Sequence, residues 1–365
     1  MAPARSRARI DRRLAQRGGA VEFLRLPSAL FAGLTRLRAA GYERGWLSRV
    51  AVPVPVISVG NLTAGGTGKT PFVALLARRL GARGERIGIL SRGYGAPRGA
   101  ARRENDEARW YREHLPAVEL VQDPDRVRGA EALLERGVDV ILLDDGFQHR
   151  RLARDLDLVL VDATRPWGLP PPNGGGAPVQ ACLPRGFLRE PPAALARADA
   201  LVITRSDQVT PRELDLLRAE LERFAPGRAL LRGVHRPARL GAPDGAVLEV
   251  TRLSGREVDV VSAIGNPEAF ERTLIALGAR VRTHRVLPDH HLYAPADLDG
   301  LGADGRWLVT TEKDAVKLAG IRPLHVLGTD FELVEGEAVL EALLDALPES
   351  DEEKRRNALH EGLHG

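Results

Sequence analysis

A glycine-rich stretch between a strand and a helix restricts the fold of this chain more than any other feature. The stretch VGNLTAGGTGKTP occupies residues 59–71 and directly follows VPVPVIS, a run of β-forming residues. The residues after it, PFVALLARRLGARG, have the apolar periodicity of a helix. A strand, a glycine-rich turn, Lys-Thr and a helix together make the arrangement of a phosphate-binding loop. This order of elements predicts an α/β fold with a nucleotide site at the turn.

The composition of the loop predicts which of its groups hold the phosphates. Successive backbone N–H groups of such a loop form a concave nest for phosphate oxygens, and glycine allows the tight curvature. We expect Lys69 to neutralise the β- and γ-phosphates of ATP and Thr70 to place its hydroxyl on Mg²⁺. The helix that begins near Pro71 would direct its positive end at the same anion. The predicted nucleotide-binding residues are Thr63, Ala64, Gly65, Gly66, Thr67, Gly68, Lys69 and Thr70.

The loop departs from both common forms of the motif. The pattern G-x-x-x-x-G-K-[ST] requires glycine where this chain has Thr63, and the variant K-G-G-x-G-K-T has lysine where this chain has Ala64. A glycine-rich loop that binds no phosphate is the alternative, and the flanking strand and helix argue against it.

The rest of the chain repeats the order of strand, turn and helix. Such alternation predicts a mostly parallel, doubly wound sheet with helices on both faces and ligands at the carboxyl ends of its strands. The predicted strands fall at residues 54–60, 87–90, 138–143, 158–161, 201–204, 258–264 and 307–310. We expect a P-loop domain over residues 51–228, a second, smaller α/β domain over 229–345 and a polar tail over 346–365.

A pair of acidic residues ends one of these strands. In VDVILLDDGFQHRRL an apolar run leads directly into Asp144 and Asp145. In P-loop proteins an acidic residue at a strand tip holds Mg²⁺, directly or through water. Neighbouring side chains point to opposite faces of a strand, so only one of the two can face the metal unless the backbone turns there. An aspartate that merely ends the strand in solvent is the alternative.

Positive charge is concentrated in the first fifty residues. They contain 11 Arg and three acidic residues, a balance of +8, whereas the remainder of the chain carries −4. This distribution argues against nucleic-acid binding by the body of the protein and for a basic appendage. The single cysteine, Cys182, excludes an internal disulfide and favours a reducing compartment.

The same N-terminal segment, residues 1–50, contains an amphipathic helix. At 3.6 residues per turn its apolar residues share one narrow arc, with Arg25 and Arg36 opposite and Pro27 in the first turn. The arc consists of Phe23, Leu26, Leu30, Leu34 and Leu37. Such a helix can lie flat on an anionic membrane. A helix packed on the protein's own core is the alternative, and no apolar run in the sequence is long enough to span a bilayer.

Several stretches resemble the tetraacyldisaccharide 4′-kinase (lipid A 4′-kinase) family. They are VISVGNLTAGGTGKTP, LSRGYG, LLDDGFQHRRL, LPRGFLREP, SAIGNPEAFERTL, LPDHHLY and VTTEKDAVKL, between residues 54 and 318. The resemblance implies transfer of the ATP γ-phosphate to the 4′-hydroxyl of a tetraacyldisaccharide 1-phosphate, which gives lipid IV-A. It also implies a peripheral (monotopic) position at the cytoplasmic face of the inner membrane, with an anionic membrane surface and an acylated disaccharide phosphate lipid as partners.

The resemblance also assigns roles to single residues. Asp106 in ENDEARW matches the family's candidate base, although Asn105 and Ala108 replace the glycine and proline of its G-D-E-P motif. His290 in PDHH matches a histidine that works with this base, and Gln148 joins Thr70 and Asp144 or Asp145 at the magnesium ion. The expected substrate residues are Arg92, Glu107 and Glu190. A zinc site of His284, His290 and His291 is a weaker alternative, because no cysteine or spaced acidic cluster accompanies them.

Two other functions share the predicted nucleotide site. A membrane-associated P-loop ATPase switch of the MinD or metallochaperone type would use the same loop and a basic helix, but it needs the lysine that Ala64 replaces. A soluble small-molecule kinase leaves the charge of the first fifty residues unexplained. We infer no obligate protein partner from the sequence.

Overall fold

The computed structural model describes residues 11, 13–93, 105–170, 178–289, 291–318 and 320–350. Within these residues the strands join into one sheet in the order β10-β9-β11-β12-β7-β6-β5-β1-β4-β2-β3, with β8 paired to β7. The strands are β1 Val56–Asn61, β2 Ile87–Ser91, β3 Glu119–Gln122, β4 Val140–Asp144, β5 Leu156–Asp162, β6 Ala200–Thr204, β7 Ala229–Gly241, β8 Val247–Leu248, β9 Glu257–Ser262, β10 Arg280–Val286, β11 Trp307–Thr311 and β12 His325–Glu335.

The sheet is mostly parallel, as the sequence predicts. Only β7 runs antiparallel to its neighbours β12 and β8, and every other named pair is parallel. Strands β1, β4 and β5 are buried along their whole length, which explains their continuous apolar runs. The predicted doubly wound α/β fold is confirmed.

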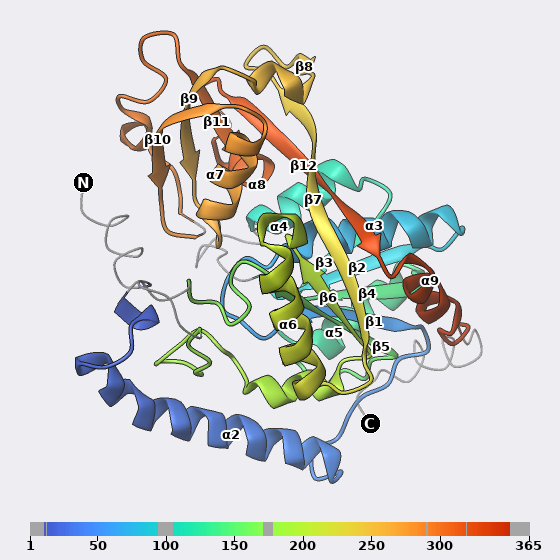
Figure 1. Ribbon diagram of the computed structural model, residues 1–365. Helices are drawn as coiled ribbons and strands as arrows, with labels where there is room; N and C mark the ends of the chain where they lie inside the picture. Colours follow the sequence, from blue (N-terminus) through green and yellow to red (C-terminus); the bar gives the residue numbers. More distant parts are fainter. Residues whose placement is uncertain are drawn as a thin grey trace.

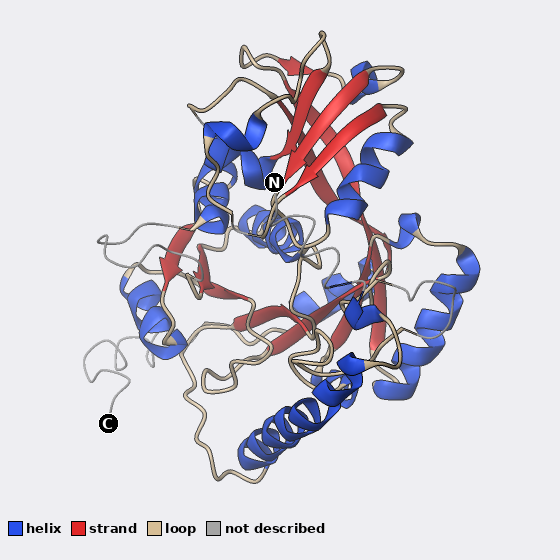
Figure 2. Ribbon diagram, turned by 90° about the vertical axis from the view of Figure 1, so that its left-hand side faces the viewer, coloured by secondary structure: helices blue, strands red, loops and turns tan. Residues whose placement is uncertain are grey.

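Helices cover both faces of this sheet (Figures 1 and 2). Their starts follow local capping rules: the side chains of Asn105, Thr210 and Asn266 accept N–H groups at the first turns of α4, α6 and α7. The helices and 3₁₀ turns are η1 Ala20–Leu24, α2 Arg25–Glu43, α3 Lys69–Ala82, α4 Asp106–His114, α5 Arg126–Glu135, η2 Pro192–Arg197, η3 Ser206–Gln208, α6 Pro211–Phe224, η4 Val250–Leu253, α7 Pro267–Ala276, η5 Pro295–Leu298, α8 Glu312–Leu318 and α9 Glu337–Asp345.

Two long strands connect a larger and a smaller lobe. The larger lobe contains β1 to β6, and the smaller lobe contains β8 to β11 with α7 and α8 (Figure 1). Strand β7 begins beside β6 in the larger lobe and pairs along its length with β12, which continues beside β11 in the smaller lobe. The lobes are therefore joined by the backbone hydrogen bonds of the β7–β12 pair, which has two register shifts.

The end of the described chain returns to the larger lobe. Leu340 and Leu344 of α9 are buried in the same apolar core as Phe72 of α3. Arg79 and Arg83 of α3 form ion pairs with Glu341 of α9. The predicted boundaries at residues 228 and 345 stay a prediction, since one sheet runs through both lobes and α9 packs on the first of them.

Helix α2 lies along the outside of the larger lobe, at the bottom of both views (Figures 1 and 2). Its inner face packs through Phe31 and Ala32, and the Ser28 hydroxyl donates to the carbonyl of Cys182 at 2.7 Å. The predicted apolar arc points the other way, because the residues Phe23, Leu26, Leu30, Leu34 and Leu37 are between 58% and 85% exposed. The arc therefore does not pack on the protein's own core.

Candidate functional site

A cavity of about 700 Å³ lies between the lobes and contains the glycine-rich loop. The loop leaves β1 at Asn61 and enters α3 at Lys69. Gly68 caps the helix with a left-handed φ of 86°, and a Cβ there would lie 2.3 Å from Nε2 of His235. Only glycine fits both the backbone conformation and the space at this position.

The first two residues of the predicted nest, Thr63 and Ala64, bind the backbone of a neighbouring segment. Thr63 forms an isolated bridge with Leu188, and the Ala64 N–H donates to the carbonyl of Phe187 at 2.7 Å. The N–H of Ala64 is thus already hydrogen-bonded within the protein and does not point to a phosphate, although the sequence placed Thr63 and Ala64 in the nest. The cavity is lined by Gly65, Gly66, Thr67, Gly68, Lys69 and Thr70, which narrows the candidate nest to these residues.

The ammonium group of Lys69 is held between two polar groups of the larger lobe. Its Nζ lies 3.1 Å from Oδ1 of Asn61 and 3.2 Å from Oδ1 of Asp145. The side chain is only 14% exposed. Lys69 therefore presents a preoriented positive charge at the start of α3, where the helix dipole has the same sign.

The two neighbouring aspartates both line the cavity because the backbone turns between them. Asp144 ends β4, and Asp145 has a left-handed φ of 58°. Burial would raise the pKa of Asp145, but Lys69 and Arg189 outweigh it and hold this pKa below its usual range. Burial and the charge of Glu107 raise the pKa of Asp144.

Of the two aspartates, Asp144 has fewer hydrogen bonds to its carboxylate. Its Oδ2 accepts the hydroxyl of Tyr111 at 3.0 Å, while its Oδ1 is buried without a hydrogen-bond partner. Both oxygens of Asp145 accept from Nη1 of Arg189, at 2.7 and 2.9 Å. Asp144 is therefore the carboxylate with a free oxygen for a cation.

Gln148 and Arg189 close this side of the cavity. Nε2 of Gln148 donates to the carbonyl of Asn61 at 2.9 Å, and its Oε1 lies 3.4 Å from Nη1 of Arg189. Arg92 and Arg126 also line the cavity, and so does Arg38, which lies on α2. The sequence prediction named Arg92 but missed Arg126 and Arg189.

Glu190 lies outside this group although its neighbour Arg189 lies inside it. The buried Glu190 carboxylate forms an ion pair with Arg197 at 2.8 Å. Arg189 and Glu190 lie in a bend and not in a strand, so no periodicity in the sequence indicates which of the two side chains faces the cavity.

The start of α4 places Asp106 and Glu107 against α8 of the smaller lobe. Nζ of Lys317 lies 3.4 Å from Oδ2 of Asp106, and Nζ of Lys313 lies 3.0 Å from Oε1 of Glu107. Burial lowers the pKa of Lys313, but the carboxylates, Glu107 first, outweigh it and raise this pKa. Glu107 lines the cavity together with Lys313.

Two of the three histidines of the alternative zinc site, His284 and His291, have separate carboxylate partners. His284 contacts Glu271 at 2.7 Å, whereas His291 contacts Asp297 at 2.8 Å. His290 lies outside the described residues, so its predicted role stays a prediction. Within the described ranges, no group of three or more His, Cys, Asp or Glu side chains is arranged to hold a metal ion.

Comparisons with known proteins identify the family of the chain. Residues 20–348 match the family model LpxK, tetraacyldisaccharide-1-P 4′-kinase. The tetraacyldisaccharide 4′-kinase of Anaeromyxobacter dehalogenans strain 2CP-C is 43% identical over 350 residues, which is 88% of this chain and 89% of that protein. The enzyme of the same name from Geobacter sulfurreducens is 38% identical over 348 residues, 88% and 92% of the two chains.

A solved structure is also similar over most of its length. It is the LpxK of Aquifex aeolicus, described as an "apo" form in complex with ATP. The TM-score is 0.67 at 33% identity, over 88% of this chain and 97% of that one. The predicted family resemblance is confirmed, and the chain belongs to the tetraacyldisaccharide-1-P 4′-kinase family.

Proposed function

We propose that this chain transfers the γ-phosphate of ATP to the 4′-hydroxyl of a tetraacylated glucosamine disaccharide 1-phosphate, forming lipid IV-A. Tetraacyldisaccharide 4′-kinase activity in lipid A biosynthesis is the activity of its family. The observation that carries the proposal is the glycine-rich loop in the cavity between the lobes, with Lys69 beside Asp145 and the open carboxylate of Asp144.

ATP would bind with its phosphates on the loop from Gly65 to Thr70 and on Lys69. The ATP complex of the related Aquifex enzyme supports this proposal. The end of the cavity in the smaller lobe is lined by Ile264, Phe270 and Leu327. These apolar side chains suit the flat face of a base.

Magnesium would be held by Asp144 and the hydroxyl of Thr70, with Asp145 and Gln148 nearby. The residues fit such an ion, because Asp144 Oδ1 is buried without a hydrogen-bond partner and Mg²⁺ in kinases needs only one or two carboxylates besides phosphates and waters. A bound Mg²⁺ would neutralise charge on the β- and γ-phosphates. Asp145 would mainly orient Lys69 and Arg189, which are its ion-pair partners.

The chemical step requires an acceptor for the proton of the 4′-hydroxyl. The hydroxyl oxygen bonds to the γ-phosphorus, the bond from that phosphorus to the β–γ bridging oxygen breaks, and ADP leaves. We assign the proton to Asp106, with His290 as its helper by resemblance. Arg92, Glu107 and Arg126 line the cavity and would contact the anionic and hydroxyl groups of the sugar lipid.

We further propose that α2 docks the protein on an anionic membrane at the cytoplasmic face of the inner membrane. The exposed arc from Phe23 of η1 to Leu37 of α2 provides an apolar stripe, and the first fifty residues carry the excess positive charge. Arg38 of this helix lines the cavity, so the site lies next to the proposed membrane face. Among the helices that the structure describes, none has the length and apolar character needed to cross a bilayer.

The decisive experiment follows ³²P from γ-labelled ATP into a tetraacyldisaccharide 1-phosphate in mixed detergent micelles. A deacylated disaccharide 1-phosphate is the matched control acceptor. Label in the acylated acceptor alone supports a lipid kinase. Hydrolysis of ATP without labelled lipid would contradict the proposal and favour the ATPase switch.

A further inference from the structure

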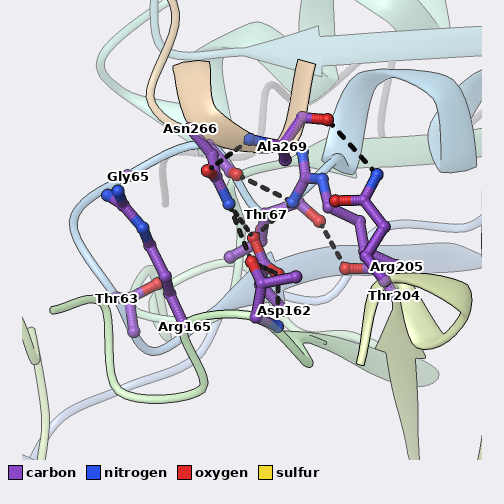
Figure 3. Close-up of polar contacts among 12 residues, drawn as sticks. Thr63, Gly65, Thr67, Asp162, Arg165, Thr204, Arg205, Asn266 and Ala269 are labelled. Carbon is purple, nitrogen blue, oxygen red and sulfur yellow. Dashed lines mark hydrogen bonds and ion pairs between the residues drawn. The ribbon is translucent and has the colours of Figure 1, made fainter. Parts of the chain in front are cut away.

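Three carbonyl groups of the glycine-rich loop are bound by side chains from its surroundings. Nδ2 of Asn61 donates to the Gly65 carbonyl at 3.4 Å, and Nη1 of Arg205 donates to the Gly66 carbonyl at 3.2 Å. The Thr204 hydroxyl donates to the Thr67 carbonyl at 2.9 Å. Figure 3 shows Thr204 and Arg205 reaching the loop from the end of β6.

Binding these carbonyls determines the direction of the N–H groups. A trans peptide is planar, so the N–H of one residue points opposite to the carbonyl of the residue before it. With the carbonyls of Gly65 to Thr67 held by protein donors, the N–H groups of Gly66, Thr67 and Gly68 point to the other side of the loop. These N–H groups are the ones that a phosphate nest requires.

Arg205 is itself held by a carboxylate that also binds the smaller lobe. Asp162, at the end of β5, is only 2% exposed and forms an ion pair with Arg205. The same Oδ2 atom accepts Nδ2 of Asn266 at 2.8 Å, and Asn266 caps α7 of the smaller lobe (Figure 3). Thr164 donates both its N–H and its hydroxyl to Oδ1 of Asp162, at 3.0 and 2.7 Å.

The backbone of the smaller lobe also touches the loop at this place. A Cβ on Gly265 would lie 2.1 Å from the nitrogen of Gly66, so the two backbones are in direct contact. Gln208 donates to the carbonyl of Ala269 at 3.3 Å, which adds another contact between the larger lobe and α7. The loop is thus enclosed between Arg205 and the start of α7.

We infer that Asp162, Arg205 and Asn266 form a positioning cluster that couples docking of the smaller lobe to the phosphate-binding geometry of the loop. Asn266 binds Asp162 only when the lobe is docked, Asp162 orients Arg205, and Arg205 holds the Gly66 carbonyl away from the phosphates. The inference deepens the proposed function and rests on it, because the ligand of the loop is taken to be a nucleoside diphosphate or triphosphate. None of the three residues needs to touch the transferred phosphate.

The test measures the dissociation constants of ADP and adenosine for the full chain by calorimetry. Arg205→Lys keeps the charge but cannot serve Asp162 and the Gly66 carbonyl together in the same geometry. We expect it to weaken ADP binding by roughly tenfold or more, with adenosine changed less than about twofold. Thr204→Val removes only the hydroxyl that binds the Thr67 carbonyl and should weaken ADP by roughly threefold to tenfold.

A second pair of variants tests the coupling to the lobe. Asn266→Ser keeps a good helix cap but is too short to reach Asp162. Arg165→Gln is the matched control, because Arg165 joins the same lobes through Glu268 at 2.5 Å without contacting the loop carbonyls. We expect Asn266→Ser to weaken ADP binding several-fold more than Arg165→Gln does.

The possible failures are distinguishable. Unchanged ADP affinity in both Arg205→Lys and Thr204→Val, or an equal loss for ADP and adenosine, would overturn the inference. Equal effects of Asn266→Ser and Arg165→Gln would overturn the coupling. If the unaltered protein bound no ADP, the proposed function itself would fail, and the inference with it. If Arg205→Lys does not fold, the ADP affinity of Thr204→Val tests the inference by itself.

Discussion

At the scale of single residues, two adjacent carboxylates acquire opposite properties. Asp145 forms ion pairs with Lys69 and Arg189, which stabilise its ionised form, so it remains charged and orients these two cations. Asp144 is buried beside Tyr111 with one oxygen unpaired, and its pKa is raised. The pair thereby separates the orientation of Lys69, the proposed phosphate ligand, from the proposed binding of Mg²⁺.

Lys69 is the residue whose loss should most affect phosphate transfer. Lys69→Ala removes the charge at the start of α3, and we expect kcat to fall by roughly 10²- to 10³-fold. The fold should persist, because Asp145 keeps its ion pair with Arg189. The labelled-lipid assay measures the rate, and circular dichroism checks the fold. Near-normal turnover would exclude the proposed phosphate role.

His235 should make the folded state sensitive to acid. Burial, together with the charge of Arg205, lowers its pKa from 6.5 to about 3. Between these values the unfolded chain binds a proton that the folded chain does not, so stability should decrease as pH falls from about 6.5 toward 3. For one group the slope is at most about 1.4 kcal/mol per pH unit.

Comparison with His235→Gln isolates this effect from other titrating groups. Urea unfolding of both proteins at pH 7, 6, 5 and 4 should give a stability difference that shifts in favour of the variant as pH falls. A difference that is independent of pH would show that His235 titrates normally in the folded state.

At the scale of elements, α2 provides an apolar stripe that the rest of the larger lobe leaves exposed. Replacing Leu30, Leu34 and Leu37 with Gln should weaken binding to vesicles of phosphatidylglycerol and phosphatidylethanolamine by at least about tenfold. Sedimentation with vesicles measures this binding. The matched control replaces the similarly exposed Leu216, Ile275 and Val339, which lie on other helices. An equal loss in both triple variants would contradict a specific role for α2.

The contact between α4 and α8 gives the TTEKDA stretch a function in the proposed mechanism. Nζ of Lys317 lies 3.4 Å from Oδ2 of Asp106 and 2.8 Å from Oδ1 of Asp314, and the Lys317 side chain is buried. Lys317→Met removes the nearer of two lysine charges that favour the ionised form of Asp106, since Nζ of Lys313 lies 4.0 Å from the same oxygen. We expect kcat to fall and the acid limb of its pH profile to move to higher pH, because a base acts only when deprotonated.

Lys317→Arg is the control for this contact. It retains the positive charge and should restore the position of the acid limb, even if kcat recovers only in part. An acid limb that does not move in Lys317→Met would show that this lysine has only a structural role.

At the scale of the whole molecule, the site depends on close contact between the lobes. Gly265→Ala would place a Cβ 2.1 Å from the backbone of Gly66, and neither backbone can yield cheaply. We expect the lobes to separate, with a larger radius of gyration by small-angle X-ray scattering and a roughly tenfold lower kcat/KM. The control is Gly81→Ala, since a Cβ at Gly81 in α3 meets no atom within 4 Å. A compact, fully active Gly265→Ala protein would contradict the importance of this contact.

Local patterns in the sequence were sufficient for the fold class and for the centre of the site. The glycine-rich loop, the strand ending in Asp144 and the arc of α2 each depend on residues close together in the chain. Backbone periodicity and turn chemistry determine such features, so they can be recognised without coordinates. The apolar runs likewise identified the buried parallel strands.

Tertiary structure decided which residues from distant segments complete the site. Arg189 faces the cavity whereas Glu190 faces Arg197, and Asp162, Arg205 and Asn266 meet at the loop although they are widely separated in the sequence. Irregular segments have no periodicity to orient their side chains, and a hydrogen bond between lobes depends on how β7 and β12 bring those lobes together. The sequence by itself therefore determined the buried parallel strands and the glycine-rich loop, but not β3, β7, β8, β10 and β12. Only the packing of the two lobes decided which partners hold that loop in its proposed binding geometry.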